Sequence, residues 1–461
     1  MQVPEKNKVL DNSLRLITVA GCLCMVYSVC ISAPLATAFY QKLGAKEFSF
    51  GLLGGIPIIM VSLQFLGAFL CNRVATRKPI FMILAILSRL LLIPIVLLPF
   101  IFPSMSKTSL IYIIILILLA SSALSNICSP LWFSWIADLV PGKILNRYWG
   151  VRQAWLYVVW TATFLAVIVY SYFVDTNVVL GFLILVVIGV AAGVVDILLF
   201  IWVKEPPNTL IVEVPVLRTF IEPLLHLEFR SFIGFSCAWA ASCTCGGVFM
   251  QLFLLKELEM DVWKASLIWC LIGISFAVSS RKWGKLADRY GQKPVVVLCL
   301  IFKPVITIVF IFLTKGNVLW VLPFWFFVDS IADAGLTIAS NGLMLKLAPR
   351  ENRSMFIASI TAFSGICSGI SAIAAGFFLE LISGFTILIF GHLFTNYHIL
   401  FAISALLRFG CIFLGMRIRD PKSSSTVHVL NDIMGIWPSR FLRFPIGLYR
   451  ISGLVLGKKD K

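Results

Sequence analysis

The stretch GKLADRYGQKP, from Gly284 to Pro294, is the densest charged group in a chain that is otherwise strongly apolar. Its charged residues, together with one just upstream, are Lys282, Lys285, Asp288, Arg289 and Lys293. Long apolar runs precede and follow it. An ionised side chain at the centre of a bilayer costs about 3 kcal/mol or more. The stretch therefore predicts a short loop between two membrane-spanning helices.

The composition of the whole chain is that of a membrane protein. Of 461 residues, 60% are hydrophobic and 13% are charged, and the mean hydropathy is +0.99. Too few polar side chains remain to cover a soluble surface. The net charge of +17 would suggest a nucleic-acid partner in a soluble protein. Here the positive residues lie in short loops between apolar runs, so we expect membrane lipids and no nucleic acid as partners.

Runs of about 20 apolar residues predict about twelve membrane-spanning helices. They start near Leu14, Phe48, Pro79, Ser109, Tyr148, Val178, Ser231, Trp263, Pro294, Val318, Ser354 and Ile399. Loops rich in Lys and Arg alternate with loops that hold few, and the positive-inside rule places the rich set in the cytoplasm. Both termini are then cytoplasmic, which agrees with an even number of spans. We expect a protein integral to the cytoplasmic (plasma) membrane.

The longest polar break before the C-terminal tail divides the predicted spans into two sets of six. We expect an N-terminal half over residues 1–203, a cytoplasmic linker over 204–230, a C-terminal half over 231–419 and a basic cytoplasmic tail over 420–461. The linker contains four prolines: Pro206, Pro207, Pro215 and Pro223. The tail mixes apolar and basic residues, which is typical of a helix lying flat on an anionic membrane. A partly disordered basic tail is the alternative.

The charged stretch has a counterpart in the first half. GAFLCNRVATRKP, from Gly67 to Pro79, joins spans two and three, as GKLADRYGQKP joins spans eight and nine. DLVPGKILNRYWGVR (Asp138 to Arg152) likewise parallels KLAPRENRSMF (Lys346 to Phe356). G-x-x-x-D-R-x-G-x-K between two spans resembles the signature loop of the major facilitator superfamily of transporters. The resemblance covers both halves and implies an all-α polytopic membrane protein, with about twelve transmembrane helices in two six-helix halves.

This resemblance also implies a gate. In the superfamily the second-half loop docks on the start of span five, so it implies that Asp288 and Arg289 form an inner latch. Gly284 would allow close helix approach and Gly291 a turn with positive φ. The residues expected to take part are Gly284, Asp288, Arg289, Gly291, Lys293, Asn72, Arg73, Asp138, Arg147, Arg152 and Arg353. An ordinary positive-inside loop is the alternative interpretation.

The first-half copy departs from the pattern. It carries Cys71 and Asn72 where the acidic residue is expected. Its latch onto the start of span eleven, near Arg353, should therefore be weaker, and gating by the two halves need not be symmetric.

A few charged residues fall inside the predicted spans, where each is a candidate for the substrate or ion pathway. Asp329 and Asp333 in span ten share one helix face, because they are four residues apart. One could carry a proton, or Lys303 on span nine could neutralise one of them. Arg89 in span three shows no evident acidic partner on neighbouring spans. Asn126 in span four could bond to it, or simply link helices.

The leading interpretation is a secondary active transporter of a small solute that works by alternating access and is coupled to protons. No G-x-x-x-x-G-K-[ST] loop for ATP occurs. A sensor or scaffold with the same fold is the alternative, as is an intramembrane prenyltransferase-like enzyme suggested by DSIAD around Asp329, although no second Asp-rich motif is present. Cys22 and Cys24 point about 200° apart on a helix and cannot chelate together. We predict no enzyme activity, cofactor or metal, and a monomer.

Overall fold

The computed structural model describes residues 3–141, 145–174, 177–208, 222–348, 353–389 and 392–418. Within these ranges, twelve helical segments are long and apolar enough to cross a membrane. They match the twelve predicted runs, and the all-α polytopic class is confirmed. The predicted tail at 420–461 and residues 209–221 of the predicted linker lie outside the described residues.

The first six spans occupy the chain from residue 3 to residue 202. They consist of α1 (Val3–Ser32) with α2 (Pro34–Lys42), α3 (Glu47–Ile59) with η1 (Met60–Leu63) and α4 (Gln64–Arg73), α5 (Lys78–Leu90) with α6 (Leu92–Ile101), α7 (Lys107–Leu139), α8 (Leu145–Val174), and α9 (Val178–Leu198) with η2 (Leu199–Trp202). Four of these spans consist of more than one helical segment. The break before Pro34 follows from a proline at the start of α2, which cannot donate a backbone hydrogen bond to the preceding turn.

The last six spans are more continuous. They are α11 (Leu227–Lys256), α12 (Val262–Tyr290), α13 (Gln292–Ile311), α14 (Val318–Leu347), α15 (Arg353–Leu381) and α16 (Asn396–Arg417). Between the last two stands a hairpin of β1 (Thr386–Ile389) and β2 (His392–Thr395), paired antiparallel with Thr386 opposite Thr395. The sequence analysis did not predict these strands. Thr395 then caps α16, because its side chain and His398 exchange hydrogen bonds with each other's backbone.

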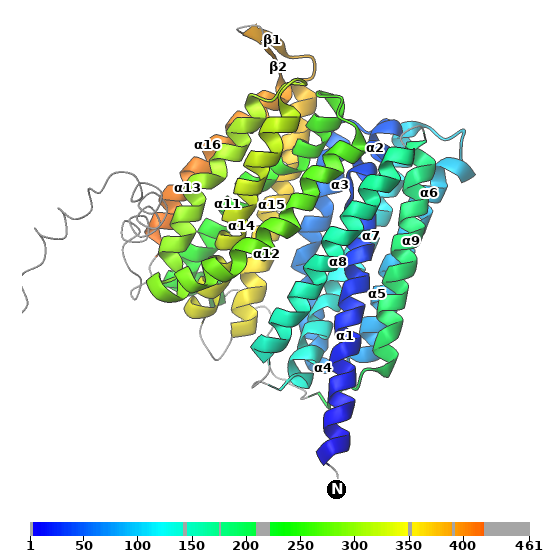
Figure 1. Cartoon of the computed structure of the whole chain (residues 1–461), viewed down its shortest axis with the longest axis vertical. Coiled ribbons are helices and arrows are strands. Elements are labelled where there is room, and N and C mark those ends of the chain that lie inside the picture. The colour runs from blue at the N-terminus through cyan, green and yellow to red at the C-terminus, as the bar shows by residue number, and fades with distance from the viewer. Residues whose placement is uncertain are drawn as a thin grey trace, which may run out of the picture.

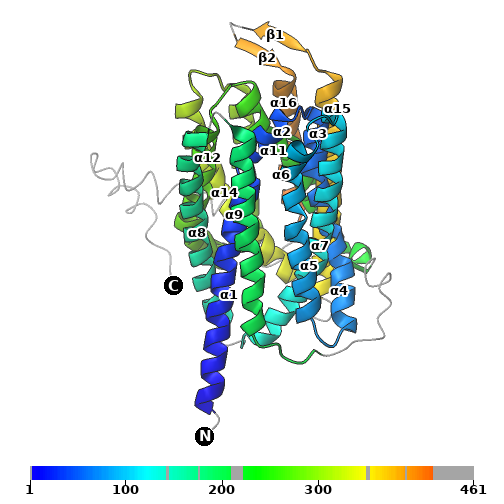
Figure 2. The ribbon, with the colours of Figure 1, turned by 90° about the vertical axis from the view of Figure 1, so that its right-hand side faces the viewer.

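The helices run roughly parallel to one long axis, so the bundle has two distinct ends (Figure 1). The N-terminus lies at one end, which we call the terminal end, and the β1–β2 hairpin projects from the other, which we call the hairpin end (Figure 2). Figure 1 places α11 to α16 on one side of the bundle and α1 to α9 on the other. The two sets of six helices meet along α3 with α15 and α8 with α12.

The buried core shows where the two sets of helices join. One apolar cluster includes Val262 and Cys270 together with side chains of the first six spans, and another joins Phe50 of α3 to Phe253 and Phe310. These two clusters lie toward the hairpin end. The clusters toward the terminal end are each confined to one set of helices, among the residues described. The two sets of helices are therefore packed together at the hairpin end.

Glycine makes the close contact of α3 with α15 possible. A Cβ on Gly55 would lie 2.7 Å from the carbonyl oxygen of Gly369, and one on Gly51 would lie 2.8 Å from that of Ala372. Real Cβ atoms do not approach backbone oxygens this closely. The two backbones can touch only because these positions carry no side chain.

Candidate functional site

A charged triad occupies the interior of the last six spans. Lys303 of α13 donates to both acidic residues of α14: its Nζ lies 2.9 Å from Asp329 Oδ2 and 3.0 Å from Asp333 Oδ1. The spacing of four residues places both carboxylates on one face, as predicted. The structure thus brings together three of the predicted pathway residues, and the ammonium group holds both acids rather than one.

The members of the triad differ in their exposure. The side chains of Lys303 and Asp329 are 7% and 16% exposed, whereas that of Asp333 is 47% exposed. Arg408 of α16 lies beside them and donates to the carbonyl oxygen of Lys303 at 3.1 Å. Two cations and two carboxylates therefore balance each other here. Asp333 is the member that solvent reaches most easily.

The prediction that Arg89 has no acidic partner is wrong. Its Nη2 lies 2.7 Å from Asp196 Oδ2 of α9, and both side chains are buried. Its guanidinium carbon lies 5.0 Å from the ring centroid of Tyr27 on α1. Asp196 lies 107 residues away in the sequence, and only the packing of α5 against α9 makes it a neighbour. The pair is enclosed between α1, α5 and α9.

Asn126 does not bond to Arg89 in the part of the chain that is described. Its Oδ1 accepts from Gln64 of α4 at 3.3 Å, and its amide donates to the carbonyl oxygen of Ser122 at 2.9 Å. This is the helix-linking alternative of the sequence analysis. Ser121, one turn earlier, donates instead to the carbonyl oxygen of Ser88 on α5.

The structure of the signature loop agrees with the prediction for Gly291 and differs from that for Gly284. Gly291 ends α12 with φ 95°, a conformation that side chains disfavour. Gly284, expected to allow close helix approach, has nothing within 4 Å of a Cβ placed on it. The expected close approach at Gly284 is therefore not present in this conformation, in which the described buried clusters at the terminal end each belong to one set of helices. Asp288 and Arg289 are exposed on α12, and Lys293 lies at the start of α13.

The predicted docking partners of this loop are described only in part. The side chains of Asn72, Arg147 and Arg353 lie outside the described residues. Described ring contacts between α8 and α12 lie farther along the helices, between Tyr157 and Phe276 and between Tyr172 and Trp263. Arg152 is turned into the first set of helices, where its guanidinium lies over the rings of Trp132 and Trp149.

The first-half copy of the loop is held by a network that the sequence analysis missed. Arg77 is fully buried, and its Nη1 lies 2.6 Å from Asp138 Oδ2 at the end of α7. Glu205 accepts from the backbone amides of Arg77 and Lys78. Arg73 instead lies over the ring of Phe69, 4.1 Å from its centroid. The repeated Asp-and-Arg pattern pointed to Asp138, but nothing local pointed to Glu205.

A second missed network closes the hairpin end between the two sets of helices. Glu47, at the start of α3, forms an ion pair with Lys256 at the end of α11, and Tyr397 of α16 donates to the same carboxylate at 3.0 Å. The pKa of the neighbouring Glu257 is raised above its usual value, and burial is the largest cause. The charge of Glu47 also raises this pKa, whereas the ammonium group of Lys256 lowers it. Glu380 of α15 accepts from the backbone amide of Phe48 at 3.3 Å.

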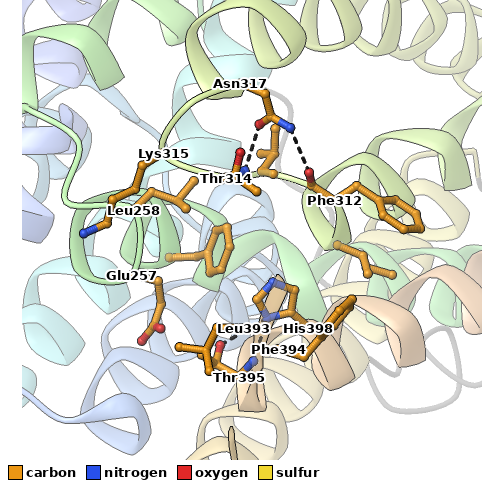
Figure 3. A pocket seen from close by; sticks show the side chains of 13 residues that line it. Glu257, Leu258, Phe312, Thr314, Lys315, Asn317, Leu393, Phe394, Thr395 and His398 are labelled. Atoms are coloured by element: carbon orange, nitrogen blue, oxygen red, sulfur yellow. Dashed lines mark hydrogen bonds between the residues drawn. The ribbon is translucent and has the colours of Figure 1, made fainter. Parts of the chain in front are cut away.

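A pocket of about 370 Å³ lies beside this network, within the last six spans. Figure 3 shows His398 and Thr395 facing the loop after α13 across it. Its lining residues are Phe253, Glu257, Leu258, Ile311, Phe312, Leu313, Thr314, Lys315, Asn317, Leu393, Phe394, Thr395 and His398. Asn317 caps its own loop, accepting from the amide of Thr314 and donating to the carbonyl oxygen of Phe312 (Figure 3). These polar groups serve local turns, and the pocket does not lie between the two sets of helices.

Comparison with known proteins agrees with this architecture. The family model of the Major Facilitator Superfamily matches residues 267–443. The structure is similar to that of the nucleoside transporter NupG, with a TM-score of 0.67 at 16% identity over 88% of this chain and 100% of that one. It is also similar to the D-xylose–proton symporter, with a TM-score of 0.64 at 13% identity over 90% and 99% of the two chains.

A third similar structure is a bacterial homologue of the human lysosomal transporter Spinster, in an inward-facing and unoccupied conformation. Its TM-score is 0.57 at 14% identity, over 91% of this chain and 95% of that one. No curated protein matches.

The chain is thus an integral membrane protein with the major facilitator fold. The family model matches residues 267–443, and the similarity of fold extends over about nine-tenths of the chain. The resemblance suggested by GKLADRYGQKP is confirmed.

Proposed function

We propose that this protein is a secondary active transporter that carries a small solute across the cytoplasmic membrane by alternating access, coupled to protons. The two halves, 1–203 and 231–419, would rock about a site between them, joined by the linker at 204–230. The basic tail at 420–461 would lie on the cytoplasmic side. The family match and the transporter fold support the class of function.

The observation that carries the proposal is the Lys303–Asp329–Asp333 triad. Two carboxylates share one ammonium group, and one of them, Asp333, is 47% exposed. A proton that binds Asp333 leaves Lys303 paired with Asp329, so the charge of the site changes by one while the buried pair persists. Such a change in charge is what a proton-coupled transporter needs at its centre.

The closure of the hairpin end supports the mechanism. Lys- and Arg-rich loops at the terminal end support a cytoplasmic location for that end, by the positive-inside rule. The structure would then be inward-facing, with Glu47, Lys256 and Tyr397 as the outer gate. In the outward-facing state, the signature loop at Asp288 and Arg289 would close the inner side against the start of α8.

Reconstitution in proteoliposomes tests this function. The purified protein is reconstituted into liposomes, pooled metabolites are supplied and an acid gradient is imposed across the vesicle membrane. The accumulation of each solute and the pH of the vesicle lumen are followed. We expect gradient-driven accumulation by the native protein. In Asp333→Asn, we expect solute exchange to persist, while the solute accumulation driven by the acid gradient falls at least tenfold. Asp261→Asn, which removes an exposed carboxylate paired with Lys264, is the control and should behave as the native protein.

Other outcomes would point to the alternatives. If Asp329→Asn and Asp333→Asn both accumulate solute normally, the triad is structural and coupling lies elsewhere. If no solute moves with the native protein, a sensor with a transporter fold becomes the better description.

A further inference from the structure

The buried charges of the first six spans do not balance. Arg89 and Arg152 are 9% and 8% exposed, but Asp196 is the one buried acidic residue near them among the described residues. Asp196 already forms an ion pair with Arg89, whose Nη2 lies 2.7 Å from Asp196 Oδ2. In the last six spans, by contrast, Lys303 is paired with both Asp329 and Asp333, and Arg408 lies beside this triad. The first six spans therefore hold one buried positive charge without a carboxylate.

That charge is the guanidinium of Arg152. Its Nε is buried and has no hydrogen-bond partner, and within the described residues no carboxylate lies within salt-bridge distance of it. A buried, unpaired charge costs several kcal/mol, and proteins normally avoid it or use it. Arg77, Arg89 and Lys303 each have a carboxylate partner. Arg408 instead donates to the carbonyl oxygens of Lys303 and Cys243. Within the described residues, Arg152 differs from these four cations because it has neither kind of partner.

Two aromatic rings flank the guanidinium of Arg152. Its guanidinium carbon lies 5.4 Å from the ring centroid of Trp132 and 5.0 Å from that of Trp149. Such contacts stabilise a cation. On α1, Gly21 makes room, because a Cβ there would lie 2.6 Å from Nη2 of Arg152. The rings offer the guanidinium no carboxylate or carbonyl oxygen, and its Nε has no hydrogen-bond partner.

Arg152 lies in the second turn of α8, toward the terminal end, where the described buried clusters do not join the two sets of helices. Trp132 and Trp149 are only half-buried, and Gln153 beside it is exposed. A solute entering from the terminal end can approach this region without passing the closed hairpin end.

We propose that Arg152, with Trp132 and Trp149, binds the anionic group of the transported solute, so that the substrate is a small organic anion bearing a carboxylate or a phosphate. This inference rests on the proposed transport function and assigns its substrate class. The anion supplies the negative charge that the first six spans lack. Its charge-assisted hydrogen bonds to the guanidinium edge, in a poorly solvated site, account for recognition. Proton binding at Asp333 then offsets the charge that enters.

A binding experiment that needs no transport tests this assignment. The purified full-length protein in detergent is titrated with lactate, benzoate, succinate and inorganic phosphate, with choline and glucose for comparison, at constant ionic strength set by sodium chloride. Thermal unfolding and tryptophan fluorescence are the readouts, since two tryptophans flank the site. We expect at least one organic carboxylate or phosphate to raise the unfolding temperature and change the fluorescence, and choline and glucose to do neither.

Three variants locate the site. Arg152→Gln should weaken the binding of the anion by about 10- to 100-fold, and Arg152→Lys should weaken it less. Without ligand, Arg152→Gln should be at least as stable as the native protein, because it removes an unpaired buried charge. If Arg152 were purely structural, Arg152→Gln would be less stable than the native protein. Lys264 also lies over a tryptophan ring, that of Trp263, but it is paired with Asp261. Lys264→Gln should therefore bind the anion as tightly as the native protein does.

The assignment is overturned if none of the anions binds, if Arg152→Gln binds them as tightly as the native protein, or if Lys264→Gln loses binding equally. These results are separable from the transport assay. Accumulation of a neutral or cationic solute without anion binding would refute the substrate class and leave the transporter function. Anion binding at Arg152 without any flux would refute transport and leave the site.

Discussion

Arg89 and Asp196 illustrate how single charged residues are accommodated inside this bundle. Each would be costly alone at bilayer depth. Together, at 2.7 Å, they form a charge-assisted hydrogen bond that solvent barely reaches. The two residues lie on spans three and six, and α1 covers them through Tyr27. This enclosure favours a structural role for Arg89 over the pathway role expected from its position in the sequence.

A double-mutant cycle tests the structural role of this pair. Arg89→Gln or Asp196→Asn alone should each lower the free energy of unfolding by about 3–5 kcal/mol, because each leaves a buried charge uncompensated. The double variant should recover a large part of that loss. Unfolding in detergent, followed by circular dichroism, measures all four proteins. Strictly additive losses would show that the two side chains do not interact.

At the scale of elements, the contact between α3 and α15 depends on small residues. In a membrane, apolar side chains gain no hydrophobic free energy by leaving lipid tails for each other. Close packing of the backbones must therefore hold these helices together. Gly51, Gly55, Gly369 and Gly376 allow that approach, and each lies on the shared face. The same geometry makes the interface sensitive to a single methyl group.

Gly369→Ala should separate α3 from α15 at the hairpin end. The added Cβ would lie 2.6 Å from the carbonyl oxygen of Gly55 and 2.3 Å from Ile59 Cγ1, and overpacking of this kind costs about 1–3 kcal/mol. Cysteines replacing Phe48 and Phe377, whose ring centroids are 6.2 Å apart, report the separation. We expect their oxidative cross-linking to slow severalfold in Gly369→Ala.

Gly410→Ala is the matched control, since nothing lies within 4 Å of a Cβ at that position. It should leave the cross-linking rate unchanged. An unchanged rate in Gly369→Ala as well would mean that the two helices are not held at this distance in the membrane.

At the scale of the whole molecule, the network of Glu47, Lys256 and Tyr397 connects the two sets of helices only at the hairpin end. The Glu47 side chain is 10% exposed and that of Lys256 is 44% exposed, so water screens part of the attraction. Even a modest contribution matters, because two global conformations of a transporter need differ by only a few kcal/mol.

Glu47→Gln should shift the protein toward the conformation that is open at the hairpin end. The loss of about 1 kcal/mol from the closed state changes the ratio of the two states roughly fivefold. Spin labels on Ser104→Cys and Gly316→Cys, in exposed loops of the two halves at the hairpin end, measure the distance by pulsed paramagnetic resonance in a cysteine-depleted background. We expect a larger population at long distance.

Asp261→Asn breaks an ion pair within one half and should leave that distance distribution as it is in the native protein. If Glu47→Gln also leaves it unchanged, the network does not contribute to closure, and the glycine-lined contact of α3 with α15 holds the hairpin end alone.

Several properties of this protein follow from the sequence by itself. The number of spans and the all-α class follow from runs of apolar residues, because in lipid each such run satisfies its backbone hydrogen bonds internally. The family resemblance follows from GKLADRYGQKP and its repeat. The shared face of Asp329 and Asp333 follows from helical periodicity. All of these are local, and they need no knowledge of neighbouring helices.

Only the tertiary structure decided which charges meet. Asp196 is the partner of Arg89, and Glu205 holds the turn at Arg77, because helices far apart in the sequence pack side by side. The open surroundings of Gly284 and the lack of a carboxylate near Arg152 likewise depend on how the helices pack. A sequence specifies the length and polarity of each span, but helix rotation and the choice of neighbours arise from packing among all twelve.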